Sequence, residues 1–376
     1  MGLRTRATQL VIGLAVLGAA IGLSACGGGK GSGSSSGGGE KFTIVMSNGF
    51  VSQWRTQMEN LAAVMSEQNA PYKGHVEFKK VVSETNPTAQ IQSINNIIAE
   101  KPDAILIDAL SPTALNPVAE KACAQGITVI FFDQEAGSGT CAYKLNEPVY
   151  ELFVNNAEWL AKTLHGHGKI IQDLGLAGSP VSQLGDKAAE EVFKKYPGIE
   201  IVAKYEGNYT PGPTKQAVSQ ILTTQKGIEG LYGIAGVDGA VQAFEETGTP
   251  MVPMTNYGDM SVRLVNLIEK NKADGLQFSM VQNAPTLAGQ ALQLAWQLLN
   301  EEGTENKEWG FKEGKEEKEV LVPAIAYNTN GLPPLPGFEP TTYKELQEMA
   351  KGLPEEALIP YSLPQSPVPA KPVIGS

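Results

Sequence analysis

The sequence predicts an α/β protein with two lobes, each built around a parallel sheet. Ten short runs rich in Val, Ile, Leu and Phe alternate with segments that have helical spacing of apolar residues. Runs with little polar alternation are typical of strands covered on both faces. A strand–helix–strand order over this length indicates parallel sheets with right-handed crossovers. Ten strands suit two lobes of about five strands each better than one sheet.

Strand and helix candidates alternate along the chain. The strands are expected at 42–47, 76–82, 104–108, 128–133, 169–173, 199–205, 230–234, 251–255, 275–281 and 320–327. Apolar spacing predicts helices at 53–68, 88–100, 239–247, around 264–268 and at 287–299. Asn86 and Pro87 form a start signal for the second helix. Residues 353–376 contain six prolines and no apolar period, so an extended tail is expected there.

The first 26 residues have the pattern of an export signal. Arg4 and Arg6 precede an uncharged stretch at 10–23, which is too short to span a bilayer and is typical of a signal-peptide core. Leu-Ser-Ala-Cys at 23–26 resembles the lipobox of bacterial lipoproteins, in which the cysteine thiol receives a diacylglycerol group. We therefore expect cleavage before Cys26, lipidation there, and anchoring outside the cytoplasm by acyl chains. The alternative is an ordinary signal peptide with an unrelated cysteine.

A tether at 27–41 is expected to separate this signal from the folded part. Residues 27–39 are only Gly, Ser and one Lys, a composition that forms a flexible coil with a root-mean-square span of roughly 20 Å. Such a tether keeps a lipid-anchored protein near a membrane partner and raises its local concentration there.

Composition and charge limit the classes of partner. Removing 26 signal residues and 13 tether residues from 376 leaves 337, which suggests about two domains. The formal charge of −11 becomes −13 once Arg4 and Arg6 are removed. An acidic chain without a basic cluster argues against nucleic acid and against direct adsorption to anionic lipid. A small neutral or weakly charged ligand is favoured.

Cysteine and histidine usage predicts a disulfide, no metal site and no cofactor. Cys123 and Cys141 are the two cysteines outside the signal, and an even pair in an exported chain is expected to form a disulfide. His75, His165 and His167 show no ligand spacing with these cysteines.

Polar and aromatic side chains follow the predicted strands. In open α/β sheets, ligands lie beyond the carboxyl ends of the strands. Those ends present Asn48, Phe50, Gln53, Trp54, Asp108, Asp133 and Gln134 in the first half, and Gln183, Tyr209, Asp238, Asn256, Tyr257, Gln282 and Asn283 in the second. Carboxylates and amides bind hydroxyl groups, and aromatic faces cover the C–H side of a sugar ring. The set favours an uncharged, hydroxyl-rich ligand, although Arg55 keeps an acidic ligand possible.

Several of these residues have a structural alternative. Trp54 can belong to the core of the first helix, and Asp238 can be the N-cap of the helix at 239–247. Asn256 and Gln282 can bond loop backbone instead of a ligand.

Several sequence blocks resemble one family. They are Thr-Ile-Val-Met-Ser-Asn at 43–48, Trp54-Arg55, Pro-Asp-Ala-Ile-Leu-Ile at 102–107, Gly-Ile-Thr-Val-Ile-Phe-Phe-Asp at 126–133 and Gly-Ser-Pro at 178–180. These blocks are similar to periplasmic sugar-binding proteins of the ribose-binding type, the solute receptors of bacterial ABC importers. The resemblance covers about residues 42–330. It implies two Rossmann-like lobes joined by a three-strand hinge, the periplasmic-binding-protein type I fold, with the ligand held between the lobes.

The resemblance also implies how the chain divides. The N-terminal lobe would take 42–143 and 283–310, the C-terminal lobe 144–282 and 318–330, and a Pro-rich extension 331–376. It further implies that the disulfide joins the helix before the fourth strand to the loop after it, which would brace Asp133.

Matching positions give the ligand-binding residues that the resemblance implies. They are Phe50, Gln53 and Trp54 beside the first strand, Asp133 and Gln134 after the fourth, and Asp238, Asn256 and Gln282 in the second lobe and at the hinge. Gln134 replaces an arginine, and residues 181–184 lack another arginine that the family usually carries. These two departures indicate a ligand other than simple ribose.

The predicted function is that of a binding protein and not of an enzyme. We expect a monomeric, lipid-anchored receptor that captures a monosaccharide, polyol or cyclitol by lobe closure and delivers it to ABC permease subunits. A ligand-sensing lipoprotein that presents its closed form to a signalling partner is the alternative. The folded part contains no Gly-x-Ser-x-Gly elbow and no His-Glu-x-x-His motif. Asp133 and Asp238 on opposite sides of an opening cleft would make a poor glycosidase pair.

Overall fold

The fold is described here for residues 41–134, 136–258, 260–281, 285–336, 338–340 and 342–359 of a computed structural model. The predicted signal peptide, Cys26, the tether up to residue 40, Gln282 and Asn283 lie outside the described residues, as does the chain after 359. Within the described ranges, every helix falls short of the length and hydropathy of a membrane span.

The first lobe is built on a seven-stranded sheet with the order β11-β12-β5-β4-β3-β1-β2. Its strands are β1 (Phe42–Asn48), β2 (Val76–Val82), β3 (Ala104–Asp108), β4 (Thr128–Phe132), β5 (Tyr143–Asn146), β11 (Lys312–Glu313) and β12 (Glu319–Leu321). Neighbouring strands are parallel except for β11 and β12. The interior strand β3 is buried along its whole length, as its unbroken apolar run predicts.

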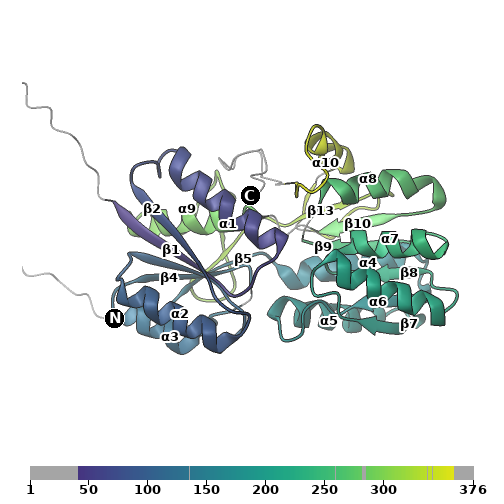
Figure 1. The fold of residues 1–376 in the computed structure, drawn as a ribbon, viewed down its shortest axis with the longest axis horizontal. Coiled ribbons are helices and arrows are strands. Elements are labelled where there is room, and N and C mark those ends of the chain that lie inside the picture. The colour runs from purple at the N-terminus through teal and green to yellow at the C-terminus, as the bar shows by residue number, and fades with distance from the viewer. Residues whose placement is uncertain are drawn as a thin grey trace, which may run out of the picture. The chain divides into compact units, whose positions relative to one another are not determined.

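Two helices cover each face of this sheet (Figure 1). The helices α1 (Gln53–Gln68) and α9 (Leu287–Leu299) pack on one face, and α2 (Pro87–Ala99) and α3 (Asn116–Ala124) pack on the other. Helix α1 begins directly after β1, because the Ser52 side chain accepts a hydrogen bond from the Arg55 N–H and so caps the first turn. This start places the first turn of α1 at the carboxyl end of the sheet.

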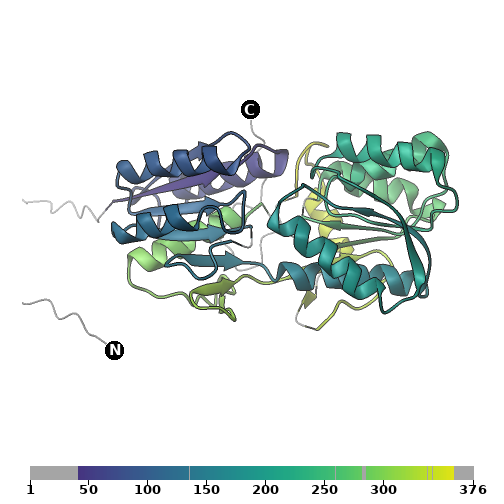
Figure 2. The ribbon, with the colours of Figure 1, turned by 90° about the horizontal axis from the view of Figure 1, so that it is seen from below.

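The second lobe repeats this arrangement with the strand order β14-β13-β10-β9-β8-β6-β7. Its strands are β6 (His167–Asp173), β7 (Gly198–Tyr205), β8 (Gly230–Tyr232), β9 (Met254–Tyr257), β10 (Phe278–Val281), β13 (Ile325–Asn328) and β14 (Glu339–Pro340). The helices α4 (Val149–Thr163) and α5 (Pro180–Phe193) pack on one face. The helices α6 (Pro211–Thr224), α7 (Val237–Thr247), α8 (Val262–Asn271) and α10 (Tyr343–Ala350) contribute to the core on the other face (Figures 1 and 2). A short 3-10 helix, η1 (Lys272–Asp274), follows α8.

The chain passes from one sheet to the other at three points. It leaves the first sheet after Asn146, returns to the first lobe between Val281 and Leu287, and leaves it again between Leu321 and Ile325. These crossings and the parallel sheets confirm the predicted fold class of two α/β lobes joined by a three-strand hinge.

The lobe boundaries differ from the prediction in two places. The expected strand 320–327 is in fact two strands, β12 and β13, which belong to different sheets because the third crossing lies between them. Residues 319–321 and 144–146 therefore belong to the first sheet, although both were assigned to the second lobe. Strand β5 was missed because four residues are too few to show an alternation pattern.

The prediction of an extended tail is wrong for residues 353–359, which form a turn and then pack against the second lobe, with residues 357–359 buried. Helix α10 begins with a capping box formed by Thr342 and Glu345. Its residues Tyr343 and Leu346 are buried in the same core as α8. After this helix, the segment 354–359 lies along residues 260–263. Three apolar residues at helical spacing, 343, 346 and 350, carry the signal for α10, and prolines on both sides of them obscured it.

Candidate ligand-binding site

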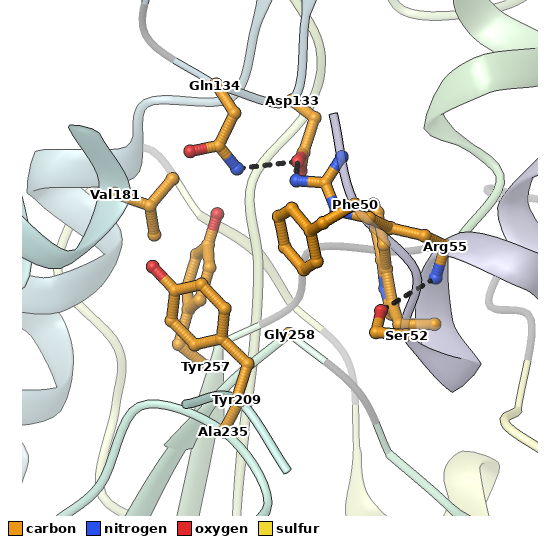
Figure 3. Close-up of a pocket in the computed structure, with 11 residues that line it drawn as sticks. Phe50, Ser52, Arg55, Asp133, Gln134, Val181, Tyr209, Ala235, Tyr257 and Gly258 are labelled. Carbon is orange, nitrogen blue, oxygen red and sulfur yellow. Dashed lines mark hydrogen bonds and ion pairs between the residues drawn. The ribbon is translucent and has the colours of Figure 1, made fainter. Parts of the chain in front are cut away.

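A cavity lies where the carboxyl ends of the first-lobe strands meet loops of the second lobe (Figure 3). The first lobe lines it with Phe50, Ser52, Trp54, Arg55, Asp133 and Gln134, and the second lobe with Val181, Tyr209, Ala235, Tyr257 and Gly258. Its empty space is about 450 Å³, including space open to solvent. The lining residues lie where the strand-end rule for open α/β sheets predicts a ligand.

Arg55 is the charged centre of the first-lobe wall. Its side chain is only 3% exposed and forms ion pairs with Asp108 and, at 3.0 Å, with Asp133 Oδ2. Its Nη1 donates to Asn48 Oδ1 at 3.0 Å, and its guanidinium carbon lies 4.0 Å from the centroid of the Phe50 ring. Burial lowers the pKa of the Arg55 guanidinium, while Asp133 acts in the opposite direction.

The charge of this array decides which ligands it favours. One guanidinium faces two buried carboxylates, so the Arg55, Asp108 and Asp133 group carries a net negative charge. A second anion brought into such a wall would be repelled, whereas hydroxyl groups can donate to carboxylate oxygens and accept from the guanidinium. The arrangement therefore argues against the acidic ligand that Arg55 alone left possible.

The backbone at Asp133 is turned to present the carboxylate. Asp133 follows β4 directly and has a φ of +65°, the left-handed conformation that aspartate tolerates better than most residues. Such a residue is costly to hold and is found preferentially at functional sites. The Gln134 amide donates to Asp133 Oδ2 at 2.7 Å, which fixes the carboxylate from the other side.

A chain of side-chain hydrogen bonds crosses from the first lobe to the second. Ser179 Oγ donates to Gln134 Oε1 at 3.1 Å, and Tyr209 OH donates to Ser179 Oγ at 2.7 Å. Ser182 Oγ lies 2.6 Å from the same phenolic oxygen and accepts from the backbone N–H of Leu176 at 2.8 Å. Both serines thus form hydrogen bonds with the Tyr209 hydroxyl, and burial raises the pKa of that phenol. Because the hydroxyl already has these partners, Tyr209 contributes its ring to the cavity lining.

The second-lobe wall is aromatic and aliphatic. Tyr257 stacks on Phe153, with ring centroids 4.6 Å apart, and Figure 3 shows Tyr209 beside Tyr257, with Val181 on the same side of the cavity and Phe50 opposite. Tyr209 has a φ of +57°, which is unusual for a bulky residue. These described second-lobe lining residues carry no charge, so this wall offers apolar surface to the cavity.

Gly175 makes room for the Tyr209 ring. A Cβ on this residue would lie 2.7 Å from Tyr209 Cε1 and 2.4 Å from Ser182 Oγ. Gly175 also has a φ of +67°, where side chains are strained. Only glycine therefore fits both the backbone and the ring at this position.

A buried carboxylate, Asp173, supports the second-lobe wall from behind. It ends β6 and accepts hydrogen bonds from the backbone N–H groups of Gly175 at 2.8 Å and Gly207 at 3.0 Å. Burial raises its pKa to about 6, and these two N–H groups oppose the shift, with smaller contributions from Ile234 and Ala235. Asp173 thus ties together the loops that carry the lining residues Tyr209 and Ala235.

Four of the predicted binding residues, Phe50, Trp54, Asp133 and Gln134, line this cavity. Three others lie elsewhere. Gln53 donates its amide to the backbone carbonyl of Glu356, and Asp238 pairs with Arg263 at 3.3 Å. The eighth, Gln282, lies outside the described residues.

Asp238 and Asn256 lie outside the lining for identifiable reasons. Asp238 is the second residue of α7, whose N-cap is Gly236, so the N-cap alternative for Asp238 is also wrong. Asn256 is fully buried inside β9, and its backbone carbonyl accepts from the Asn156 amide. Because successive side chains of a strand point to opposite faces, Tyr257 lines the cavity in its place.

Sequence reasoning missed several lining residues. Tyr209 and Tyr257 were among the strand-end residues but were not chosen as binding residues. Arg55 was noted only for the charge of the ligand. Ser52 had a recognisable signal as an N-cap. Val181, Ala235 and Gly258 carried no signal, because apolar and small residues resemble the core.

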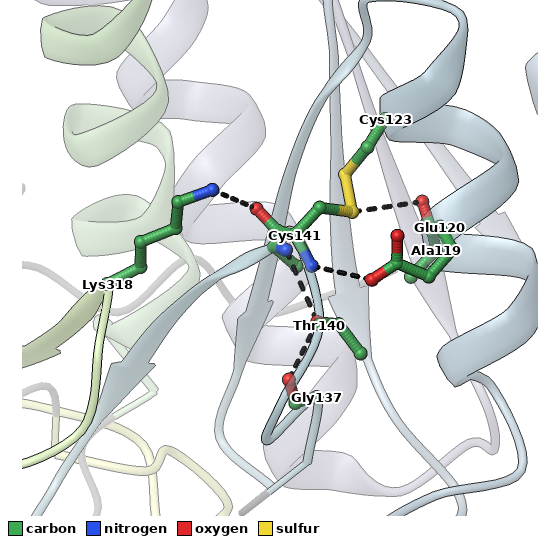
Figure 4. The surroundings of a disulfide bond; sticks show 8 residues. Ala119, Glu120, Cys123, Gly137, Thr140, Cys141 and Lys318 are labelled. Carbon is green, nitrogen blue, oxygen red and sulfur yellow. Dashed lines mark hydrogen bonds between the residues drawn. A yellow bond between two sulfur atoms is a disulfide. The ribbon is translucent and has the colours of Figure 1, made fainter. Parts of the chain in front are cut away.

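The predicted disulfide between Cys123 and Cys141 is present (Figure 4). It joins α3, before β4, to the loop that follows β4 and begins with Asp133 and Gln134. The Cys141 N–H also donates to Glu120 Oε1 at 2.7 Å, and its carbonyl accepts from Lys318 Nζ at 2.6 Å. The far end of the Asp133 loop is therefore held covalently and by two hydrogen bonds.

Comparison with known proteins gives consistent matches. A family model described as a periplasmic binding protein domain matches residues 43–304. A galactofuranose-binding protein of Escherichia coli (strain K12) is 23% identical over 252 residues, 65% of this chain and 77% of that protein. A xylitol-binding protein of Mycolicibacterium smegmatis is 22% identical over 238 residues, 62% of this chain and 65% of that protein. The crystal structure of an ABC transporter solute binding protein from Thermobispora bispora is similar with a TM-score of 0.70 and 25% identity, over 86% of this chain and 92% of that one.

Proposed function

This chain belongs to the periplasmic binding protein family, and from that premise we propose that it is an extracytoplasmic receptor for an uncharged monosaccharide, polyol or cyclitol in an ABC import system. The family that the sequence blocks indicated is thereby confirmed, and its relatives are binding proteins and not enzymes. Two of those relatives are described as binding galactofuranose and xylitol, both small and rich in hydroxyl groups.

The observation that carries this proposal is the pairing of two unlike walls around one cavity. The Arg55–Asp133–Gln134 array offers charged and amide partners for hydroxyl groups. The rings of Phe50, Tyr209 and Tyr257 offer apolar faces for C–H groups. A sugar or cyclic polyol has both kinds of surface, hydroxyl groups on its edge and C–H groups on its faces.

Binding would act by closure of the lobes. The lining residues come from both lobes, so a ligand that contacts both walls stabilises the arrangement in which they face each other. A permease would recognise this closed form. Lipidation at Cys26 and the tether at 27–41 would keep the receptor at the membrane that holds the permease.

A thermal-shift screen of the mature protein tests the ligand class. Galactose, arabinose, xylitol and myo-inositol form one set, and amino acids and nucleosides form the other. One or a few members of the first set should raise the unfolding temperature. Shifts confined to the second set would refute the sugar proposal.

A pair of variants ties that shift to the cavity. Asp133→Ala should abolish the shift while the protein stays folded, because the hydroxyl groups of the ligand lose a charged acceptor. Asp274→Ala changes an exposed aspartate of the second lobe and should leave the shift at its wild-type value. Wild-type affinity in Asp133→Ala would remove Asp133 from the site.

Mass spectrometry of the exported protein tests the anchor. The expected product begins at Cys26 and carries acyl chains, and Cys26→Ser should be released from the membrane fraction. An unlipidated wild-type N-terminus would leave the soluble-receptor part of the proposal standing and remove the anchor.

A further inference from the structure

The segment 354–359, here called the C-terminal segment, is part of the second lobe. The N–H of Val262 donates to the Ala357 carbonyl at 2.9 Å, and the N–H of Arg263 donates to the Glu355 carbonyl at 3.0 Å. The N–H of Ile359 donates to the Met260 carbonyl at 2.8 Å. The Ala357 and Ile359 side chains are buried in the core formed with α8 and α10.

The same segment is also bonded to the first lobe. The Gln53 amide of α1 donates to the Glu356 carbonyl, and the Gln57 amide donates to the Leu358 carbonyl at 2.8 Å. The side chain of Gln57 is buried, with an exposed fraction of 5% for the residue. Because α1 belongs to the first lobe, these two bonds connect the lobes outside the hinge and outside the ligand cavity.

The backbone of the C-terminal segment divides its carbonyl groups between the two lobes. Carbonyls 355 and 357 accept from the second lobe, and carbonyls 356 and 358 accept from the first. The segment begins with a turn, in which the Ala357 N–H donates to the Pro354 carbonyl at 3.0 Å, and Leu358 then pairs with Ser261 in an antiparallel bridge. A single short segment thus bonds to both lobes along its length.

The two ends of this connection lie beside the ligand cavity. Gln53 and Gln57 stand on the first turns of α1, next to the lining residues Trp54 and Arg55. Residues 260–263 follow the lining residues Tyr257 and Gly258. The C-terminal segment therefore holds the element that begins the first-lobe wall against the loop that ends the second-lobe wall.

We propose that the C-terminal segment is a clasp that holds the two walls in their ligand-enclosing arrangement, with Gln53 and Gln57 as positioning residues. Separation of the lobes must break both amide bonds and leave the buried Gln57 amide to be resolvated. The clasp thus favours the closed arrangement before any ligand enters. The role of the clasp in enclosing a ligand rests on the proposed function. Its effect on the distance between the lobes does not, because the clasp bonds form without ligand.

A distance measurement without any sugar tests the clasp. Spin labels attached through p-acetylphenylalanine at the exposed positions Lys73 and Glu200, one in each lobe, leave all cysteines unchanged. Pulsed electron spin resonance then gives the distribution of the distance between the lobes. The wild-type protein should show a short-distance population. The double variant Gln53→Ala/Gln57→Ala should lower the ratio of short to long distances about tenfold, the effect of two ordinary hydrogen bonds.

The control is Gln68→Ala, which makes the same change at an exposed residue at the far end of α1. It should reproduce the wild-type distribution. Hydrogen exchange at Val262 and Arg263 should stay slow in the double variant, which shows that the C-terminal segment remains docked on the second lobe. Equal distributions in the double variant and the wild type, or a wild type with long distances only, would overturn the clasp. Since no sugar is present, failure of the sugar proposal leaves this result unaffected.

Discussion

The two walls of the cavity each depend on a buried carboxylate at the end of a parallel strand, in opposite electrostatic settings. Asp133 follows β4, pairs with Arg55 at 3.0 Å and lines the cavity. Asp173 ends β6, accepts backbone N–H groups and lies behind the wall, outside the lining. The first lobe thus presents charged side chains to the cavity, whereas the Asp173 carboxylate of the second lobe holds backbone loops of its own lobe.

This difference assigns separate tasks to the two lobes. In the proposed receptor, the first-lobe wall would recognise hydroxyl groups through charged partners that are fixed in place by Asp108 and Gln134. The second-lobe wall would cover the ligand with Val181, Ala235 and the tyrosine rings, and so would remove water from those charged partners. Polar contacts become stronger once water is excluded, so closure of the second wall should increase the selectivity of the first.

The largest expected effect comes from removing the cation of the first wall. Arg55→Met leaves two buried carboxylates, Asp108 and Asp133, without their positive partner. Breaking a buried ion pair in this way costs about 3–5 kcal/mol of unfolding free energy. Urea unfolding at pH 7 measures the loss.

The matched control is Arg263→Met in the second lobe. Arg263 pairs with Asp238 at 3.3 Å, but its side chain is 30% exposed, so water screens the pair. We expect a loss of about 1 kcal/mol. Equal losses of unfolding free energy in the two variants would contradict the prediction that the buried ion pairs of Arg55 contribute more to stability than the partly exposed pair of Arg263.

The second prediction concerns the pH dependence of the second wall. The Asp173 pKa is raised from 3.8 to about 6 by burial, so the folded protein binds more protons than the unfolded chain between these values. Stability from this group is fully present below about pH 4 and is lost as the pH rises through about 6. The total is about 3 kcal/mol at most.

Asp173→Asn removes this titration, so urea unfolding curves from pH 4 to pH 7 should show a smaller decline in the variant than in the wild type. The readout is the slope of stability against pH, which does not depend on how well asparagine packs at this position. Parallel slopes in the two proteins would mean that Asp173 titrates alike in the folded and unfolded states.

The fold and half of the site could be predicted because their signals are local. The apolar run before Asp133 predicts a buried strand, and ligands lie beyond the ends of such strands. The spacing of apolar residues in α1 and α9 gives their bounds as the structure has them. Phe50, Trp54, Asp133 and Gln134 follow from these elements alone.

The remaining part of the site depends on contacts between distant segments. Whether Asn256 or Tyr257 lines the cavity is a matter of one residue in the register of β9, which strand composition does not determine. Gln53 has the composition of a sugar ligand but bonds to Glu356, 303 residues away. Val181 carries no polar group, so only its position at the start of α5 identifies it.

The third prediction tests whether the second wall depends on the placement of one ring. Gly175→Ala introduces a Cβ that would lie 2.7 Å from Tyr209 Cε1, so the ring must move. We expect sugar affinity to fall about tenfold and stability to fall by about 1–2 kcal/mol. Calorimetric titration with the ligand found in the thermal-shift screen measures the first effect.

Gly178→Ala separates backbone strain from the displaced ring. Gly178 also has a positive φ, +81°, but a Cβ there meets nothing within 4 Å. The same substitution should therefore reduce stability by about 1 kcal/mol and leave affinity unchanged. A similar loss of affinity in both variants would mean that strain in the loop, and not the Tyr209 ring, controls binding.

The smallest effect comes from the hydrogen-bonded chain through Ser179 that links the two walls across the cavity. Ser179→Ala removes the hydroxyl that donates to Gln134 and accepts from Tyr209, whereas Ser182→Ala removes bonds to Tyr209 and to the backbone N–H of Leu176, both within the second lobe. Each change should cost about 1 kcal/mol of stability or less. Only Ser179→Ala should also weaken sugar binding, by about threefold, because Gln134 then loses its second-lobe partner and holds Asp133 less firmly. If Ser182→Ala weakened binding equally, the two serines would act only by orienting the Tyr209 ring, and the walls would recognise the ligand independently of each other.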